Sequence, residues 1–269
     1  MTDLFGNKIE IDTNILTHSE KIEKAIKDFK KNEKLALNMN SKGYHISFSG
    51  GKDSIVLYDL FKKSGCKGQG YFYNTQLEIP EVPIFIRKHY PEVIFLYPKK
   101  SFMQLISEKQ MLPTRRIRFC CAFLKEHYGN NELVCSGIRA SESWRRKIQN
   151  PTDFKHICMG KIGEKLMYSP ILYFTEKDIF KYIKDNNLIL PNFYKTKKRS
   201  GCIGCPMSSH SQKELLEYPK LFNAMIKAID KNFNKEKSPF ENTLDMFKWW
   251  FSQKSIDNYL KSKNQLNLF

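Results

Sequence analysis

Short apolar runs and longer amphipathic stretches alternate along most of the chain. The first amphipathic stretch covers residues 19–39, where apolar residues such as Ile22 and Ile26 recur near helical spacing with charged residues between them. This pattern predicts a helix with Ser19 as its N-cap. An apolar run at residues 44–48 follows and predicts a buried strand.

Further segments of the same two kinds follow. Residues 69–73, 93–97 and 132–138 are apolar runs that predict strands, and residues 81–89 predict a helix. Strands that alternate with helices are typical of βαβ units, in which helices cover both faces of a parallel sheet. We therefore expect an α/β fold with a doubly wound, mostly parallel sheet that begins near residue 44.

The pattern changes toward the C-terminal part of the sequence. Thr175 begins a further predicted helix with a capping-box-like cluster, and residues 211–269 are expected to be helical throughout. No linker-like composition precedes them, so we expect a C-terminal helical cap on the α/β core. The aromatic stretch at residues 247–251 favours core or interface packing over base stacking. The expected parts are an N-terminal helical segment (1–43), an α/β domain (44–207) and the cap (208–269).

Composition and charge narrow the function classes. Of the 269 residues, 41% are hydrophobic and 27% are charged, which is typical of a globular protein. No apolar run approaches the roughly 20 residues of a membrane span, and no apolar signal segment begins the sequence. We therefore expect a cytoplasmic protein without a membrane partner. The net charge of +17 favours phosphate-rich partners such as nucleotides, DNA or RNA, although many lysines have the spacing of a solvated helix face.

Two glycines lie between the first predicted strand and the next helix, within the six-residue segment Ser49-Gly50-Gly51-Lys52-Asp53-Ser54. A strand that turns through glycines into a helix presents backbone N–H groups and the positive end of the helix to a phosphate. The spacing differs from the Walker A pattern, GxxxxGK[ST]. In the functional interpretation, backbone and hydroxyl groups hold the phosphates, the lysine neutralises charge, and the aspartate holds Mg²⁺ or positions a phosphate. In the simpler alternative, Ser54 only caps the helix.

Arginines follow the strand expected at residues 132–138. Because parallel strands end at the same edge of a sheet, Arg139, Arg145 and Arg146 are expected near the glycine loop. Guanidinium groups suit bidentate contact with phosphate or sulfate. We expect Arg139 to contact a nucleotide or an oxyanion, with Glu142 orienting one of the arginines.

Four of the seven cysteines form two close pairs: Cys120 and Cys121 are adjacent, and Cys202 and Cys205 form a CxxC motif. Structural disulfides are uncommon in the cytoplasm, and four thiolates suit a tetrahedral zinc or an iron–sulfur cluster. Adjacent side chains point apart in extended backbone, so a [4Fe-4S] cluster is favoured over zinc. Unligated thiols are a third interpretation.

The remaining cysteines and the basic residues beside the pair have simpler interpretations. Three cysteines are expected to be ordinary small apolar residues: Cys66, Cys135 and Cys158. Three cationic neighbours would stabilise thiolates or an anionic cluster, or hold an anionic substrate: Arg115, Arg116 and Arg118.

These motifs together resemble the phosphoadenosine-phosphosulfate reductase family of the adenine-nucleotide α-hydrolase, or ATP pyrophosphatase, superfamily. The matching segments are SGGKDS at 49–54, YNTQLEIPE at 73–81, CC at 120–121, GIRASESWRR at 137–146, SPILYFTEKDI at 169–179 and RSGCIGCP at 199–206. The cysteine pattern is similar to that of iron–sulfur adenylylsulfate reductases and of sulfur-transfer proteins of DNA phosphorothioation. The resemblance implies that the loop binds ATP or another adenylyl nucleotide with Mg²⁺. It also implies that Cys120, Cys121, Cys202 and Cys205 hold a [4Fe-4S] cluster.

One departure from the family pattern affects the expected reaction. Sulfonucleotide reductases use a C-terminal cysteine as the nucleophile, and this sequence has no cysteine after Cys205. The resemblance therefore favours an iron–sulfur ATP pyrophosphatase that adenylylates a substrate, or binds an adenylyl nucleotide, to support sulfur transfer. Nucleic acid is an expected acceptor and a sulfur donor protein an expected partner. Two alternatives stay open: a sulfonucleotide (PAPS/APS) reductase, and a non-catalytic nucleotide- or redox-sensing protein. The sequence assigns no catalytic residue.

Overall fold

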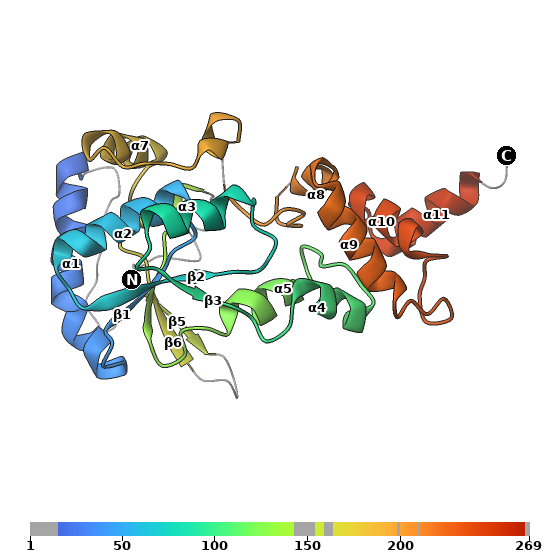
Figure 1. Ribbon diagram of the computed structural model, residues 1–269, viewed down its shortest axis with the longest axis horizontal. Helices are drawn as coiled ribbons and strands as arrows, with labels where there is room; N and C mark the ends of the chain where they lie inside the picture. Colours follow the sequence, from blue (N-terminus) through green and yellow to red (C-terminus); the bar gives the residue numbers. More distant parts are fainter. Residues whose placement is uncertain (1–15, 143–153, 159–163, 198–199, 209, 267–269) are drawn as a thin grey trace. The chain divides into compact units, whose positions relative to one another are not determined.

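The computed structural model describes residues 16–142, 154–158, 164–197, 200–208 and 210–266 (Figure 1). The chain forms two compact units. The first comprises residues 1–73, 80–96 and 127–200, and the second comprises 74–79, 97–126 and 201–269. This grouping does not test the expected division into residues 1–43, 44–207 and 208–269, which stays a prediction.

A mixed sheet forms the centre of the first unit. Its described strands are β1 (Tyr44–Ser47), β2 (Gly68–Tyr73), β3 (Ile94–Leu96), β4 (Leu133–Cys135), β5 (Phe154–Cys158) and β6 (Glu164–Tyr168). They lie in the order β3-β2-β1-β4-β6-β5, and every neighbouring pair is parallel except β6 and β5. In the register, Ile46 of β1 lies opposite Gly70 on one side and Cys135 on the other. The expected α/β class with a doubly wound, mostly parallel sheet is confirmed.

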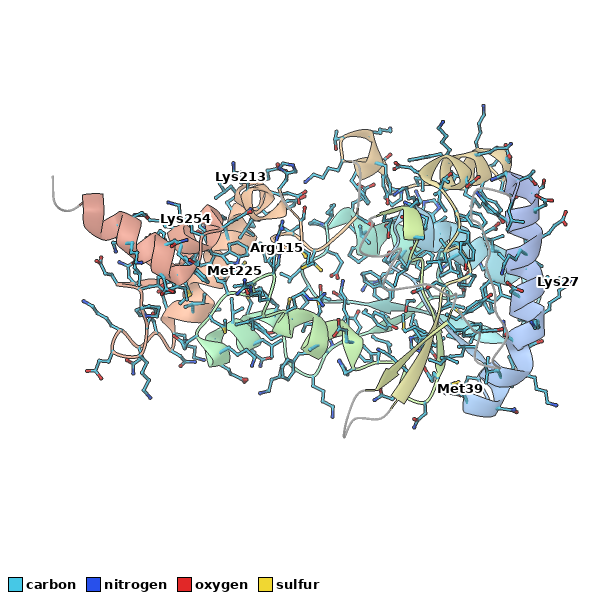
Figure 2. All side chains as sticks on the ribbon, turned by 180° about the vertical axis from the view of Figure 1, so that it is seen from behind. Lys27, Met39, Arg115, Lys213, Met225 and Lys254 are labelled. Atoms are coloured by element: carbon cyan, nitrogen blue, oxygen red, sulfur yellow. The ribbon has the colours of Figure 1, made fainter. Side chains whose placement is uncertain are left out.

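Helices of the first unit pack against this sheet. They are α1 (His18–Met39), α2 (Lys52–Ser64), α3 (Glu81–His89) and α7 (Glu176–Asp185), with 3₁₀ turns η2 (Ala140–Glu142) and η4 (Asn192–Lys195). Both α1 and α7 pack against α2 (Figure 1). The ring of Phe29 lies edge-on to those of Tyr44, Phe61 and Tyr168, and all four are buried. Lys27 is exposed on α1 (Figure 2), as a solvated helix face requires.

The second unit is helical. Its elements are α4 (Phe102–Lys109), α5 (Phe119–Cys121), the π-helix η1 (Ala122–Glu126), α8 (Ser211–Glu214), η5 (Leu215–Glu217), α9 (Pro219–Asp230), α10 (Thr243–Ser252) and α11 (Ile256–Leu266). Helix α4 packs on α9. Phe247 and Trp250 of α10 are buried, and the Trp250 indole N–H donates to the carbonyl of Pro113 at 2.7 Å. The aromatic stretch therefore packs in a core, as expected. No helix among the described residues is long and apolar enough to cross a bilayer.

The structure corrects two details of the sequence interpretation. The N-cap of α1 is Thr17, not Ser19, because Thr17 forms a reciprocal capping box with Glu20, three positions later, whereas the residue three positions after Ser19 is Ile22. The antiparallel hairpin of β5 and β6 was not expected at all. Strand β6 lies beside β4 in the sheet, so the hairpin extends the sheet by two strands.

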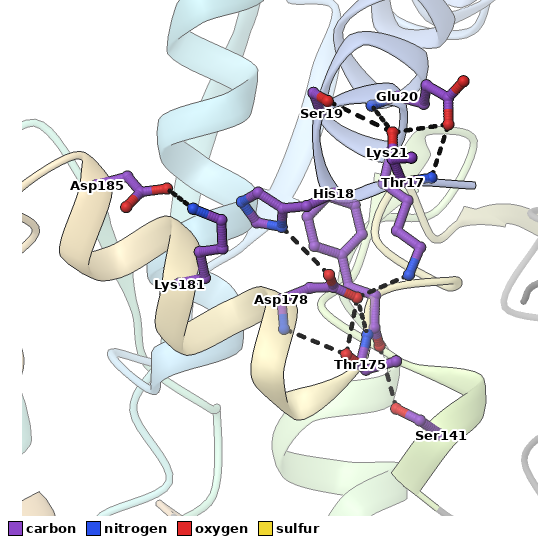
Figure 3. Close-up of polar contacts among 11 residues, drawn as sticks. Thr17, His18, Ser19, Glu20, Lys21, Ser141, Thr175, Asp178, Lys181 and Asp185 are labelled. Atoms are coloured by element: carbon purple, nitrogen blue, oxygen red, sulfur yellow. Dashed lines mark hydrogen bonds and ion pairs between the residues drawn. The ribbon is translucent and has the colours of Figure 1, made fainter. Parts of the chain in front are cut away.

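A buried ion pair ties α1 to α7 (Figure 3). Asp178 accepts hydrogen bonds from the Lys21 ammonium at 2.7 Å and contacts His18 Nδ1 at 3.2 Å. The same carboxylate accepts from the backbone N–H of Thr175, the N-cap of α7. Burial raises the pKa of Asp178, but the hydrogen bonds from Lys21 and Thr175 outweigh burial and hold that pKa well below its usual range.

Replacing Asp178 with Asn leaves the buried Lys21 charge without its partner. At pH 7 we expect the free energy of unfolding to fall by roughly 3 kcal/mol, measured by urea denaturation. A carboxyl group with a depressed folded pKa stabilises above its unfolded pKa of about 3.9, and this contribution is lost as pH falls toward the folded value. The difference between the two proteins should therefore shrink below pH ~4. The control Asp185→Asn, in an exposed pair with Lys181, should cost much less. Equal losses in both variants would contradict this account.

Candidate functional site

The strand order places two loops at the topological switch point of the sheet. Strand β1 lies between β2 and β4, so the loops that follow β1 and β4 leave the same carboxyl edge side by side. The first loop is the glycine segment 49–54, and the second leads to Arg139. The two predicted halves of this site are therefore brought together by the topology.

The glycine loop has a backbone that only glycine accommodates well. Gly50 has φ +70°, and a Cβ there would lie 3.0 Å from the Val82 side chain of α3. Gly51 is the N-cap residue of α2 and has no side chain to satisfy the first-turn N–H groups. A Cβ at Gly51 would lie 2.3 Å from the hydroxyl of Ser200. The turn therefore brings backbone, not side chains, to the start of α2.

Hydroxyl groups hold this turn together. The Ser54 hydroxyl donates to the carbonyl of Gly51 at 2.9 Å and accepts from the Ser49 N–H at 3.2 Å. The Ser49 hydroxyl also donates to Ser54 at 3.1 Å. The N-cap of α2 is Gly51 and not Ser54, whose hydroxyl instead ties both ends of the loop together. The N–H groups of Asp53 and Ser54 lie in the first turn, where no intrahelical acceptor exists.

Asp53 and Arg139 form the central ion pair of the site. Arg139 is only 4% exposed, and its Nε donates to Asp53 Oδ1 at 2.7 Å. The other carboxylate oxygen of Asp53 accepts from the Lys52 ammonium at 3.2 Å. Two cations therefore share the Asp53 carboxylate at the start of α2.

Neighbouring groups fix the Arg139 side chain. Its Nη1 donates to the Ser141 hydroxyl at 3.0 Å, and Nη2 lies 4.0 Å from a Glu142 carboxylate oxygen. Glu142 therefore lies beside this arginine, as the sequence indicated. Arg145 and Arg146 lie outside the described residues. Asp53 was expected to hold Mg²⁺ or to position a phosphate, but its carboxylate contacts Arg139 and Lys52. The sequence alone could not show these contacts.

Tyr194 was missed by the sequence analysis. Its hydroxyl accepts the backbone N–H of Lys52, the first residue of α2, at 2.8 Å. The residue lies 142 positions after the loop and carries no motif that would mark it, so only the fold reveals the contact.

The four cysteines of the two pairs line one cavity of about 30 Å³ in the second unit. Cys202 pairs with Glu78 through an isolated β-bridge, and the Ile203 N–H donates to the carbonyl of Leu77 at 2.7 Å. The CxxC turn is thereby fixed against residues 74–79, while α5 contributes the adjacent pair.

The extended backbone assumed for the adjacent cysteines is wrong. Cys120 and Cys121 lie in the short helix α5 and their side chains are hydrogen-bonded to each other. This hydrogen bond lowers the pKa of Cys121 and raises that of Cys120. The backbone of the pair therefore no longer argues against zinc.

Lys125 supplies a cation inside the cysteine cavity. Its ammonium donates to Cys202 Sγ at 3.3 Å and lies 3.9 Å from a Glu78 carboxylate oxygen. Burial raises the pKa of Cys202, and the Lys125 charge partly offsets that effect. The Thr75 hydroxyl lies 3.7 Å from the same sulfur. The sequence analysis missed Lys125, because its partner Cys202 lies 77 positions later in the sequence.

Arg115 links the two cysteine segments (Figure 2). Its Nε donates to the carbonyl of Pro206, directly after the CxxC motif, at 3.0 Å. Arg116 and Arg118 are exposed. Cys135 is buried, as an ordinary apolar cysteine should be, and Cys66 lies in the first unit; the side chain of Cys158 is outside the described set.

The cysteine cavity has the donor chemistry of a metal centre, but its thiols are not arranged around one point. In the described part of the chain, no three His, Cys, Asp or Glu side chains converge on one point as they stand. The donor set nevertheless has the right chemistry, with four thiols around one cavity and a cation that favours thiolates. The thiols would have to approach one another to share a metal or cluster.

Comparison with known proteins agrees with the motifs. Residues 43–211 match the family described as the phosphoadenosine phosphosulfate reductase domain. The chain belongs to this family. The matched range includes the glycine loop, Arg139 and all four cysteines of the cavity. An uncharacterized protein of Methanocaldococcus jannaschii is 30% identical over 227 residues, which are 78% of this chain and 53% of that protein. The chain thus spans about half the length of that curated relative.

Among solved structures, a Candida glabrata FMN adenylyltransferase in complex with FAD and inorganic pyrophosphate is similar in fold. The TM-score is 0.50 at 13% sequence identity, covering 92% of this chain and 77% of that one. At this identity the likeness concerns the fold alone. It agrees with a family domain built on a parallel sheet.

Replacing Asp53 with Ala removes the nearest carboxylate of the buried Arg139 guanidinium and leaves only Glu142, at 4.0 Å. We expect the free energy of unfolding to fall by roughly 3 kcal/mol in urea denaturation at pH 7. The control Glu92→Ala breaks an exposed pair with Lys62, also anchored on α2, and should cost much less. If Asp53→Ala were as mild as the control, the ion pair would not organise the loop.

Proposed function

We propose that the chain is an enzyme of the ATP pyrophosphatase type that binds an adenine nucleotide at residues 49–54. The observation that carries the proposal is the convergence of the glycine turn, Lys52 and Arg139 at the switch point of the sheet. The proposed activity is to adenylylate a substrate in support of sulfur transfer. Membership of a family named for a sulfonucleotide reaction favours an adenylyl ligand.

In the proposed reaction, an oxygen nucleophile of the substrate attacks the α-phosphorus of ATP. A new phosphorus–oxygen bond forms, the bond to the β-phosphate bridge breaks, and pyrophosphate leaves with the electron pair. The nucleophile's proton passes to solvent. Lys52 and Arg139 would stabilise the charge that develops on the phosphates, and Asp53 would hold both cations in place. Mg²⁺ would bind with the nucleotide phosphates, and Asp53 would become a ligand only by releasing the Lys52 ammonium from its second carboxylate oxygen.

The cysteine cavity is proposed to hold a [4Fe-4S] cluster through Cys120, Cys121, Cys202 and Cys205. When bound, such a cluster would supply iron atoms that can bind sulfur and accept or donate electrons. Lys125 would counter the negative charge of the thiolates, since it already contacts Cys202 Sγ. None of the cysteines that the structure describes forms a disulfide, as expected at the proposed cytoplasmic location.

Nucleic acid is the proposed sulfur acceptor, and a sulfur donor protein is the proposed partner. The net charge of +17 favours a polyanion. The exposed Arg116 and Arg118 lie just before the adjacent cysteines. These arginines belong to the same unit as the thiols, so a phosphate backbone that they bind would be held by the segment that carries Cys120 and Cys121.

Sulfonucleotide reduction is the second candidate, since the family match carries that name. It would appear as sulfite release from a sulfonucleotide in the presence of thioredoxin. A third outcome, tight adenine-nucleotide binding without turnover, would identify a sensing protein.

Radiolabelled ATP offers a direct test of the proposed reaction. With nucleic acid and a sulfur source present, we expect AMP and pyrophosphate in equal amounts. Lys52→Met should lower the turnover rate by roughly 100-fold or more, because it removes a cation from the developing charge. Lys62→Met, on the exposed face of the same helix, is the matched control and should leave turnover unchanged. Absence of both products with every acceptor would refute the proposal.

Anaerobic reconstitution with iron and sulfide tests the cysteine centre. We expect about four irons and four sulfides per chain for a [4Fe-4S] cluster. The reconstituted protein should be brown, with a broad absorption band in the visible range. Replacing any one of the four cavity cysteines with Ser should lower the iron content or the stability of the cluster. Cys66→Ser, outside the cavity, is the control. A colourless protein that takes up one zinc ion would instead identify a zinc site.

A further inference from the structure

A tyrosine hydroxyl lies at the position where the phosphate loop offers its first helical N–H. Tyr194 belongs to the 3₁₀ turn η4 (Asn192–Lys195), and its hydroxyl oxygen accepts the Lys52 N–H at 2.8 Å. The same hydroxyl lies 3.3 Å from the position that a Cβ on Gly51 would occupy. The phenol therefore lies directly over the start of α2.

The turn that carries Tyr194 is held firmly. The Glu81 carboxylate of α3 accepts the backbone N–H groups of Asn192 and, at 3.0 Å, of Phe193. Phe193 is buried, and so is Pro191. Among the described hydrogen bonds of this turn, the one from Lys52 to Tyr194 is the contact with the glycine loop. The neighbouring residues fix the backbone of the turn. The contact is thus a built feature and not the chance position of a surface side chain.

A phosphate oxygen and the Tyr194 hydroxyl require the same donor. An N–H in the first turn of a helix binds one strong acceptor, and a phosphate dianion is a better acceptor than a neutral phenol oxygen. Both cannot accept the Lys52 N–H in good geometry. We propose that Tyr194 is an internal competitor for the phosphate site: its hydroxyl satisfies the Lys52 N–H in the ligand-free protein and is displaced by a nucleotide phosphate.

This inference rests on the proposed nucleotide site and adds a positioning residue to it. The hydrogen bond to Tyr194 stabilises the ligand-free loop, and a phosphate must break it to bind. The binding free energy of phosphate is therefore less favourable by the free energy of one neutral hydrogen bond. Removing the hydroxyl should then tighten binding. A merely structural role would give the opposite sign, because a damaged loop binds more weakly.

The experiment measures inorganic pyrophosphate and ATP binding by isothermal titration calorimetry. Tyr194→Phe should bind both ligands roughly 2- to 10-fold more tightly than the parent protein. Glu81→Ala, which frees the turn without touching the loop, should shift affinity in the same direction. Tyr97→Phe, in the second unit, is the matched control and should change nothing. Hydrogen exchange of the Lys52 amide, followed by NMR in the ligand-free protein, should be faster in Tyr194→Phe.

Each outcome has a distinct meaning. Weaker or unchanged binding in Tyr194→Phe, with normal binding by the parent protein, overturns the competitor and leaves the nucleotide site intact. Binding in Tyr194→Phe alone, with none in the parent, supports a competitor strong enough to block the site. If neither protein binds either ligand, the nucleotide site is refuted and the competitor with it. Unaltered Lys52 amide exchange also counts against the competitor, because it is measured without any ligand.

Discussion

The ion pair of Asp53 and Arg139 is the constraint around which the glycine loop is organised. It joins the start of α2 to the loop after β4, and it gives the buried Arg139 guanidinium its nearest carboxylate. The contact continues outward, because Arg139 donates to Ser141, and the Ser141 hydroxyl donates to the carbonyl of Phe174. The next residue, Thr175, caps α7.

From α7 the same chain of polar contacts reaches α1. Thr175 shares the carboxylate of Asp178 with Lys21, so the N-terminal helix is tied through one N-cap and two ion pairs to the glycine loop. Polar groups buried in series are stable only if every member is satisfied. The geometry of the loop therefore depends on residues outside it, from Lys21 on α1 to Asp178 on α7.

The sequence predicted the fold class and the location of the loop because both depend on local patterns. Apolar runs of strand length marked β1, β2 and β3, and the glycines could serve only a turn. It missed the β5–β6 hairpin, because pairing between strands is a long-range choice that local composition does not fix. Tyr194 and Lys125 were beyond reach for the same reason: their importance comes from what the fold places beside them. The adjacent cysteines were placed in the wrong backbone, since two residues cannot define a helical turn.

The division into two units has a consequence for how the molecule could be taken apart. The chain crosses between the units after residues 73, 79, 96, 126 and 200. Each unit is consequently discontinuous, and no single cut would release the cysteine cavity as a continuous fragment. Segments of the two units alternate along the sequence, so the strands of the first unit and the cysteine pairs of the second cannot be separated by one exchange of sequence. Insertions and deletions in loops leave this arrangement intact. The two candidate sites are therefore expected to be inherited together.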